Sequence, residues 1–491
     1  MSYQSLEFMI VFAGIAAGFY FLPRGLRKWW LLAASLCFYL THTPKHMVFL
    51  AGIILVSYGA GLLIEKCRSA SAGTRKAVLA ASLVITFATL ALMKYGQFAV
   101  KYLPTQVKQP FNALAIRIGA PLGLSFFTFA AAGYLIDVYR GKRDAERNLA
   151  DYALFLSFFP TIMSGPVERS TGLLQQIRDV KKIELNTWNV RHGLLTMLWG
   201  AFLKMVIADR LNTLVNTVFA DHFAYGGVVL VLAVLAFGIQ LYCDFGGVSY
   251  IALGAGEVLG FRLIDNFNTP YFSLSIGEFW RRWHVSLSSW LRDYVYIPLG
   301  GNRKGKVRKY INNMIVFLVS GVWHGVGATF IIWGGLNGLF IVLGDLLKPL
   351  RDRICTLCHI DRDNAGNRFL RGLFTYLLVN FTWLFFRAQH FTQCRQILQR
   401  IALHPFPAQL LDGTLLKLGL DGAEWFVLLI SLALLLCASI ARYRGVDWKA
   451  KLLEQGFLFR CLCYAAMMVF MLLFALYGPG FDAAAFIYAG F

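Results

Sequence analysis

One histidine stands out in this sequence as a candidate for chemistry. His324 is the only side chain that ionises near neutral pH within the uncharged stretch Tyr310–Gly344. Burying an ionisable group at membrane depth is costly, so such a residue is typical of a functional site. Ser320, Gly321 and Gly325 leave room beside it for a substrate. The alternative is a neutral histidine that is hydrogen-bonded to a backbone carbonyl.

A second candidate, His284, lies in the aromatic and basic segment Phe279–Tyr294. At a helical period, the polar residues Arg281, Ser288 and Arg292 share one face, and His284 falls at its edge. The opposite face collects apolar residues: Trp280, Trp283, Leu287, Trp290, Leu291 and Tyr294. This pattern predicts one helix at the membrane interface or against the wall of a funnel. Such a helix often serves only as an anchor.

Two histidines of this kind suit acyl transfer without a covalent enzyme intermediate. A neutral imidazole, with an unperturbed pKa of about 6.5, takes the proton from an acceptor hydroxyl as its oxygen attacks a thioester. The sequence carries no zinc signature and no nucleophile elbow, so no metal is expected. The nine Cys residues are scattered. Cys355–His359 has the spacing of a c-type haem attachment site, but its basic surroundings indicate the cytoplasmic side, where that haem is not attached.

The segment Gly300–Lys309 follows as a predicted flexible basic loop. Its order of residues is not that of a nucleotide-hydrolysing loop. Arg303, Lys304, Lys306 and Arg308 are candidates for docking an anionic acyl carrier or coenzyme. Binding of lipid headgroups is the alternative.

The composition of the chain indicates that these candidate site residues are carried by a membrane protein. The chain has 491 residues, of which 58% are hydrophobic and 15% charged, and a mean hydropathy of +0.58. Soluble domains carry about 25% charged residues, so disorder and a cytosolic enzyme are excluded. We expect about 11 to 13 membrane-embedded helices. Nine come from uncharged stretches: Phe8–Pro23, Trp29–Pro44, His46–Ile64, Ala77–Met93, Phe223–Cys243, Tyr310–Gly344, Gly372–Phe386, Trp425–Ala441 and Cys461–Phe481. Three shorter or interrupted candidates are Ala113–Ile136, Tyr152–Met163 and His192–Phe202.

The charge balance is best explained by topology. Lys and Arg total 47 and Asp and Glu total 26, a formal net charge of +21. Basic residues gather in cytoplasmic loops and face anionic headgroups, so no nucleic acid partner is expected. Their alternation between the predicted spans places both termini outside the cytoplasm.

The motifs around both histidines closely resemble the membrane-bound O-acyltransferase (MBOAT) family, and its alginate O-acetylase branch most of all. The resemblance is carried by Glu278–His284, Trp290–Arg303 and Ser320–Gly325. Further matching motifs are Leu122–Phe129, Ile136–Gly141, Phe159–Pro160, Ser164–Pro166, Asp244–Gly247, Asn266–Tyr271 and Phe486–Tyr488.

The resemblance implies an all-helical polytopic bundle, a single domain over residues 1–491, with a central funnel or tunnel. It implies that His324 is the general base and that His284 assists by orienting the substrate or donor. Five further residues are expected to form the substrate or donor site: Trp323, Arg292, Asp293, Arg281 and Ser320. Asp293 has an alternative role as a structural ion-pair partner of Arg281 or Arg292.

The implied reaction moves an acyl group, expected to be acetyl, from a cytoplasmic thioester to an extracytoplasmic polysaccharide such as alginate. The expected donor is acetyl-CoA or another acyl thioester, and no bound cofactor is expected. Expected partners are an acyl carrier protein, membrane lipids and an extracytoplasmic acetyltransferase or other glycan-modifying protein. The expected location is the bacterial cytoplasmic (inner) membrane.

Two alternatives remain. Val248–Tyr250 lacks a carboxylate that the alginate branch carries there, and Ser164–Arg169 also resembles the branch that transfers D-alanine from a carrier protein to teichoic acid. A transporter of lipid-linked glycans is the more distant alternative. It predicts broken half-helices in two similar halves, and the sequence shows no such symmetry.

Overall fold

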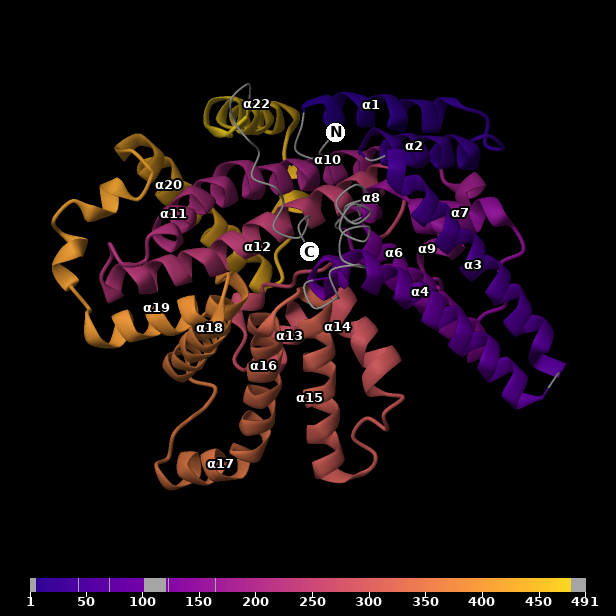
Figure 1. Ribbon diagram of the computed structural model, residues 1–491. Coiled ribbons are helices and arrows are strands. Elements are labelled where there is room, and N and C mark those ends of the chain that lie inside the picture. The colour runs from indigo at the N-terminus through magenta and orange to yellow at the C-terminus, as the bar shows by residue number, and fades with distance from the viewer. Residues whose placement is uncertain are drawn as a thin grey trace. The chain divides into compact units, whose positions relative to one another are not determined.

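The computed structural model of the chain describes residues 6–42, 44–69, 71–100, 121, 123–163 and 165–477. Within these residues every regular element is helical, apart from one isolated bridge between Phe267 and Trp283. This confirms the predicted all-helical fold (Figure 1). Ser164, most of the first half of Ala113–Ile136 and the motif Phe486–Tyr488 lie outside the described residues.

The chain divides into two compact units. One extends to Trp199 and includes Val248–Asp265, and the other comprises Gly200–Gly247 and the chain from Asn266 onward. The assignment of residues 1–491 to one functional domain stays a prediction.

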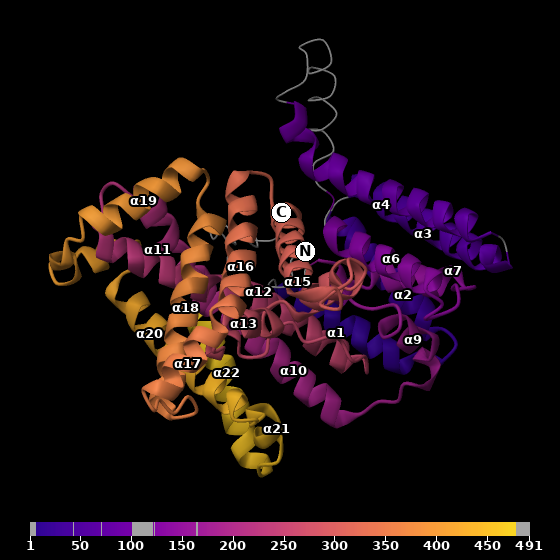
Figure 2. The same cartoon turned by 90° about the horizontal axis from the view of Figure 1, so that it is seen from below.

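The first unit is built from the N-terminal helices. They are α1 (Leu6–Phe21), α2 (Arg27–His42), α3 (Met47–Lys66), α4 (Ala72–Val100), α6 (Leu124–Tyr139), α7 (Leu149–Ser157), α8 (Phe159–Ile162), α9 (Leu173–Arg178) and most of α10 (Thr187–Phe202). Helices α3, α4 and α6 lie side by side in both views (Figures 1 and 2). Tyr134 of α6 packs against Gly61 of α3, where a Cβ would lie 2.6 Å from the Tyr134 hydroxyl.

The second unit holds both candidate histidines. Its elements are the π-helix η4 (Leu203–Ala208), α11 (Asp209–Ala220), the first part of α12 (Gly227–Val258), α13 (Ile276–Arg282), α14 (Val285–Leu291), the π-helix η6 (Arg292–Tyr296), α15 (Gly305–His324), α16 (Ala328–Leu346), α17 (Lys348–Leu357), α18 (Ala365–Arg387), α19 (Phe391–Leu403), α20 (Gly422–Tyr443), α21 (Trp448–Leu453) and α22 (Phe457–Phe474). Short 3-10 turns occur in several of the connections.

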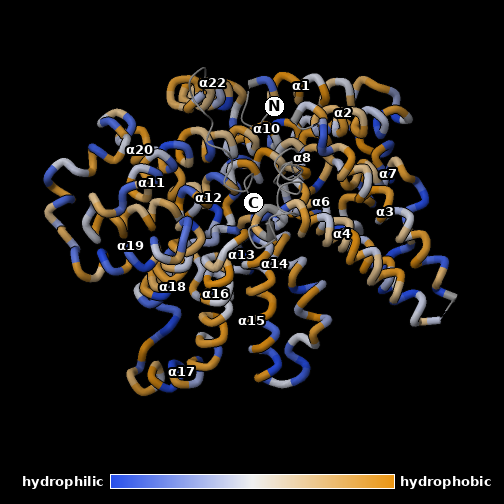
Figure 3. The backbone as a smooth tube through the Cα atoms, in the orientation of Figure 1, coloured by the Kyte–Doolittle hydropathy of each residue, from blue (hydrophilic) through white to orange (hydrophobic). Residues whose placement is uncertain are grey.

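Seven helices within the described residues are long and apolar enough to cross a membrane. They cover Pro44–Lys66, Ala72–Gly96, Gly227–Val258, Ala328–Leu346, Ala365–Arg387, Gly422–Tyr443 and Phe457–Phe474. Their apolar character is visible along the backbone (Figure 3). Glu7–Phe21 and Leu124–Tyr139 are shorter apolar helices. These findings support a polytopic membrane fold, while the number of shorter helices that enter the bilayer stays a prediction.

The long uncharged stretch Tyr310–Gly344, which is counted as one predicted span, is divided between two helices. Helix α15 ends at His324, and α16 begins at Ala328. Gly325 makes the turn between them possible, because a Cβ there would lie 2.2 Å from the ring of Phe330. His324 is therefore the last residue of its helix, beside a turn that admits no larger side chain.

In the first unit, the segment after α8 buries a carboxyl group. Glu168 is 5% exposed, and its Oε1 accepts a hydrogen bond of 2.7 Å from the backbone N–H of Ile264. Burial raises the pKa of the Glu168 carboxyl to about 7. This group belongs to the sequence motif Ser164–Arg169, and its role there is to fix the backbone before α9 to the chain after α12.

Candidate active site

The predicted single helix over Phe279–Tyr294 is wrong, because the structure breaks it at His284. Helix α13 ends at Arg282, and His284 adopts a left-handed conformation with φ of 45° before α14 begins. Asn266 causes this break, since its carbonyl accepts from the N–H of Val285 at 3.1 Å and its Oδ1 accepts from the N–H of Ser286 at 3.3 Å. A distant segment thus supplies hydrogen bonds that replace those of a continuous helix.

The predicted separation of the two faces nevertheless holds. Arg281 and Arg292 are exposed, whereas Ser288, predicted on the same face, is half-buried, and His284, predicted at its edge, is buried. The apolar residues predicted to share a face are all buried: Trp280, Trp283, Leu287, Trp290, Leu291 and Tyr294. The apolar surface is buried by two short helices at an angle rather than by one long amphipathic helix.

The break buries His284, which is 1% exposed. Its ring packs edge to face against Phe245 of α12, with ring centroids 4.6 Å apart. Its Nδ1 lies 3.4 Å from Oδ1 of Asn266. The imidazole is therefore held on two sides, by an aromatic ring and by an amide oxygen, and it is removed from bulk water.

His324 lies at the end of α15 within a wall of aromatic rings and is 2% exposed. Its ring centroid is 4.9 Å from that of Trp333 and 5.4 Å from that of Phe386. Trp323 bridges the two histidines, because its ring lies 4.7 Å from His324 and 6.1 Å from His284. Two imidazoles predicted from separate motifs are thus brought together around one indole.

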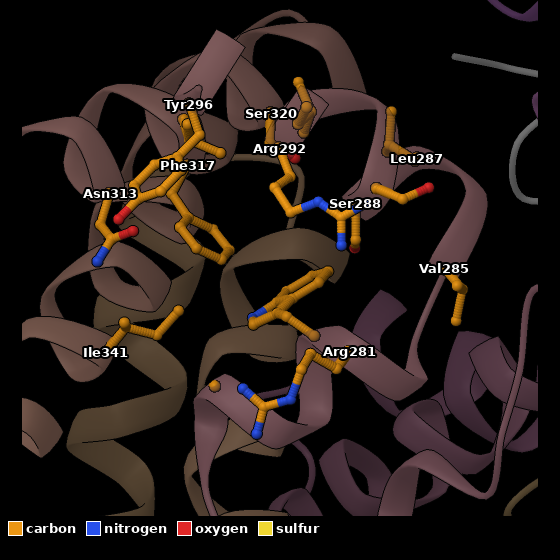
Figure 4. A pocket seen from close by; sticks show the side chains of 15 residues that line it. Arg281, Val285, Leu287, Ser288, Arg292, Tyr296, Asn313, Phe317, Ser320 and Ile341 are labelled. Atoms are coloured by element: carbon orange, nitrogen blue, oxygen red, sulfur yellow. The ribbon is translucent and has the colours of Figure 1, made fainter. Parts of the chain in front are cut away.

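A cavity of about 400 Å³ opens beside this pair (Figure 4). It is lined by Gly277, Trp280, Arg281, Val285, Leu287, Ser288, Ser289, Leu291, Arg292, Tyr296, Asn313, Val316, Phe317, Ser320 and Ile341. Three predicted site residues are among them: Arg281, Arg292 and Ser320. Ser320 precedes His324 by one helical turn, and Val285 follows His284 directly. The cavity is lined by residues close to the two histidines in the chain, and not by His284, His324 or Trp323 themselves.

Asp293 pairs with Arg292, which decides between the two structural partners considered for it. Its Oδ1 lies 2.9 Å from Nε of Arg292. Arg281 has no ion pair within the described part of the chain, and it is one of the residues that line the cavity (Figure 4). Arg281 therefore carries an uncompensated positive charge at the cavity, whereas the charge of Arg292 is partly neutralised.

The basic segment Gly300–Lys309 is only partly a loop. Residues up to Lys304 form turns, and α15 begins at Gly305, so Lys306 and Arg308 lie in its first turn. Nδ2 of Asn312 donates to the carbonyl of Gly301 at 2.8 Å and holds the turns against the helix. A helix N-terminus already carries a partial positive charge, so lysine and arginine there create a site that favours anions.

The sequence reasoning missed a buried charge cluster behind His284. Nζ of Lys204 lies 2.7 Å from Oδ1 of Asp209 and 2.7 Å from Oδ1 of Asp244, and all three side chains are at most 2% exposed. Asp244 immediately precedes Phe245, the ring that contacts His284. A signal was present, because Lys204 is the only charged residue between Arg191 and Asp209.

The described residues contain no group of three or more His, Cys, Asp or Glu side chains that could hold a metal ion.

Comparison with known proteins identifies the family to which this chain belongs. Residues 113–386 match the model of the MBOAT, membrane-bound O-acyltransferase family. The probable alginate O-acetylase AlgI of Azotobacter vinelandii is 37% identical over 397 residues, which cover 79% of this chain and 76% of that protein. The peptidoglycan O-acetyltransferase of Helicobacter pylori is 31% identical over 430 residues, covering 80% and 78%. The teichoic acid D-alanyltransferase of Streptococcus thermophilus is 29% identical over 282 residues, covering 54% and 67%. The chain is an integral membrane O-acyltransferase and belongs to the MBOAT family.

Proposed function

We propose that this O-acyltransferase moves an acetyl group from a cytoplasmic thioester to hydroxyl groups of an extracytoplasmic polysaccharide such as alginate. The observation that carries the proposal is the pairing of His324 and His284 around Trp323, with a neighbouring cavity lined by Ser320, one helical turn before His324. The similarity to a probable alginate O-acetylase of Azotobacter vinelandii and to a peptidoglycan O-acetyltransferase of Helicobacter pylori supports an acetyl group and a polysaccharide acceptor.

In the proposed mechanism, His324 is the general base. Its imidazole takes the proton of the acceptor hydroxyl while that oxygen forms a bond to the thioester carbonyl carbon. The carbon–sulfur bond then breaks, and the imidazolium returns the proton to the leaving thiolate. The aromatic wall excludes water, which would otherwise hydrolyse the thioester. His284 orients the donor or acceptor, and Trp323 keeps the two rings at a fixed separation.

The proposed donor is acetyl-CoA or another acyl thioester that enters the cavity. The mostly apolar lining suits the flexible arm of such a donor, and it includes Ser320, one helical turn before His324. Arg281 and Arg292 supply positive charge for phosphate groups, and Asp293 restrains Arg292. Arg303, Lys304, Lys306 and Arg308 extend this positive charge to the start of α15, where a coenzyme or an acidic acyl carrier protein would dock.

We place the enzyme in the bacterial cytoplasmic membrane with both termini outside the cytoplasm. This orientation rests on the distribution of basic residues. In this orientation, the acyl group crosses the bilayer within the protein. It is then passed to the glycan directly or through a separate extracytoplasmic acetyltransferase. One functional domain, residues 1–491, would carry out all of these steps.

D-alanyl transfer from a carrier protein to teichoic acid is a second candidate. The motif around Glu168 and the similarity to the Streptococcus thermophilus D-alanyltransferase favour it. The mass of the transferred group separates the two, because an acetyl group and a D-alanyl group differ in composition.

The deciding experiment is mass spectrometry of extracytoplasmic glycans from cells with the intact gene, a deletion and the His324→Ala variant at matched protein levels. Loss of one acyl mass in both altered strains is expected, and that mass identifies the group. Normal acylation with His324→Ala would overturn the assignment of the base.

A second experiment tests donor docking. Reversing Lys304, Lys306 and Arg308 to Glu is expected to raise the donor KM at least several-fold, with a smaller effect at high salt. An unchanged KM would leave these residues as topological charges.

A further inference from the structure

Helix α17 (Lys348–Leu357) lies on the surface of the α15–α18 region and contacts the neighbouring α16. No residue of α17 is buried. It follows α16 directly and turns across the end of that helix (Figure 1). Lys309 of α15 pairs with Asp345 of α16 at 2.9 Å, so the start of α15 and the end of α16 lie at the same end of this helical pair. Helix α17 therefore lies where a membrane-spanning helix leaves the bilayer.

The apolar residues of this helix form one stripe. Leu347, Leu350, Ile354 and Leu357 are between 46% and 70% exposed. At 3.6 residues per turn they fall within an arc of about 80°. A stripe of this width on a helix with no buried residue is typical of a helix that lies in the plane of the membrane interface. The alternation of apolar and polar residues along α17 is visible in Figure 3.

Basic residues border the stripe. Arg353 lies on one side of it, and Arg351 and then Lys348 lie on the other. None of the three has a carboxylate partner among residues that the structure describes. Asp352, the acidic residue of the helix, is already paired with Arg362. The exposed surface of α17 is therefore apolar in its centre and positive along both edges.

From this arrangement we infer that α17 binds anionic phospholipids, with its apolar stripe among the acyl chains and Lys348, Arg351 and Arg353 on the headgroups. Charge complementarity selects anionic over zwitterionic lipid, because three uncompensated cations border a stripe that must face hydrocarbon. Helix α15 begins at the same end of the helical pair as α17 and carries His324 at its other end. Anionic lipid thus braces the end of the α15–α16 pair that lies away from this histidine.

Hydrogen exchange of the full-length enzyme in nanodiscs tests the inference. One set of discs contains phosphatidylcholine alone, and the other an equimolar mixture with phosphatidylglycerol. The amides of α17 are expected to exchange at least several-fold more slowly in the anionic discs. The amides of α19 serve as the internal control, because this helix buries Cys394 and Ile397 in the protein, and they should not change.

Two variants separate the causes. Reversing Lys348, Arg351 and Arg353 to Glu should abolish the difference between the discs, and Leu350→Ser with Ile354→Ser should remove protection in both. Unchanged α19 exchange shows that each variant is folded. Equal α17 exchange of the parent enzyme in the two discs would overturn the inference. So would protection that appears only on addition of an acyl carrier protein, since the occupant would then be a protein.

Discussion

Gly321 of α15 and Gly334 of α16 face each other at the closest approach of the two helices. A Cβ on Gly334 would lie 2.3 Å from the carbonyl oxygen of Phe317 and 3.3 Å from Cα of Gly321. A Cβ on Gly321 would lie 2.4 Å from the carbonyl oxygen of Phe330. Backbone contact of this kind fixes the register of the two helices, and with it the position of Trp333 beside His324.

Gly334→Ala is expected to separate the helices and to lower both stability and acyl transfer. Overpacking of this kind costs about 1–3 kcal/mol, and a shift near the reacting groups reduces the rate further. Gly335→Ala is the matched control, because its Cβ would meet only Leu318 at 3.9 Å. Thermal unfolding and turnover of both variants check the prediction. Equal behaviour of the two would show that the close contact at Gly334 does not set the site.

His284→Asn tests the second histidine without changing its backbone. Asparagine tolerates the left-handed conformation that His284 adopts, so the strain that alanine would add is avoided. We expect turnover to fall by a factor on the order of 10², with the melting temperature little changed. Full turnover with a normal melting temperature would reduce His284 to a packing residue.

Arg281→Gln is expected to raise the donor KM several-fold while turnover at saturating donor is retained. The reason is that Arg281 contributes an uncompensated charge at the cavity but no proton transfer. Arg281→Lys should recover part of the affinity, since charge is kept and the planar fork is lost. Steady-state kinetics against donor concentration measure both. A fall in turnover at unchanged KM would contradict a role in binding the donor.

Lys204→Met is expected to destabilise the enzyme by about 3–5 kcal/mol, because it leaves two buried carboxylates without their cation. Adding Asp209→Asn and Asp244→Asn should restore much of the loss, since the cluster is then neutral. Thermal unfolding of the single and triple variants gives the comparison. A single variant as stable as the parent would mean that the cluster does not hold α12 behind His284.

An ionisable residue that is isolated in an apolar run is visible in the sequence. His324 was found in this way, and the same signal was available at Lys204. The partners of Lys204 were not predictable. An α-helix would turn Lys204 and Asp209 about 140° apart, and it is the π-helix η4 that brings residues five apart onto one side.

The break in the helix at His284 could not be predicted either, for a different reason. The apolar period runs without interruption through Trp283 and Leu287, so a local reading continues the helix. The hydrogen bonds that end it come from Asn266, which lies far from it in sequence. The residues that the apolar period predicts to be buried are buried, whereas the path of the backbone is set by the tertiary contact with Asn266.

Glu168→Gln is expected to stabilise the enzyme at about pH 8 and to change little near pH 4.5. Burial raises the pKa of the folded carboxyl to about 7 from an ordinary value of 4.5. As the pH rises from 4.5 to about 7, the Glu168 carboxyl group loses its proton in the unfolded chain before it does so in the folded protein. The parent enzyme therefore loses stability over this range and stays less stable at higher pH. The penalty is on the order of 3 kcal/mol. Glutamine is always neutral and its oxygen can still accept from Ile264. Melting temperatures of both proteins across this range measure the effect, and parallel curves would contradict a buried, protonated Glu168.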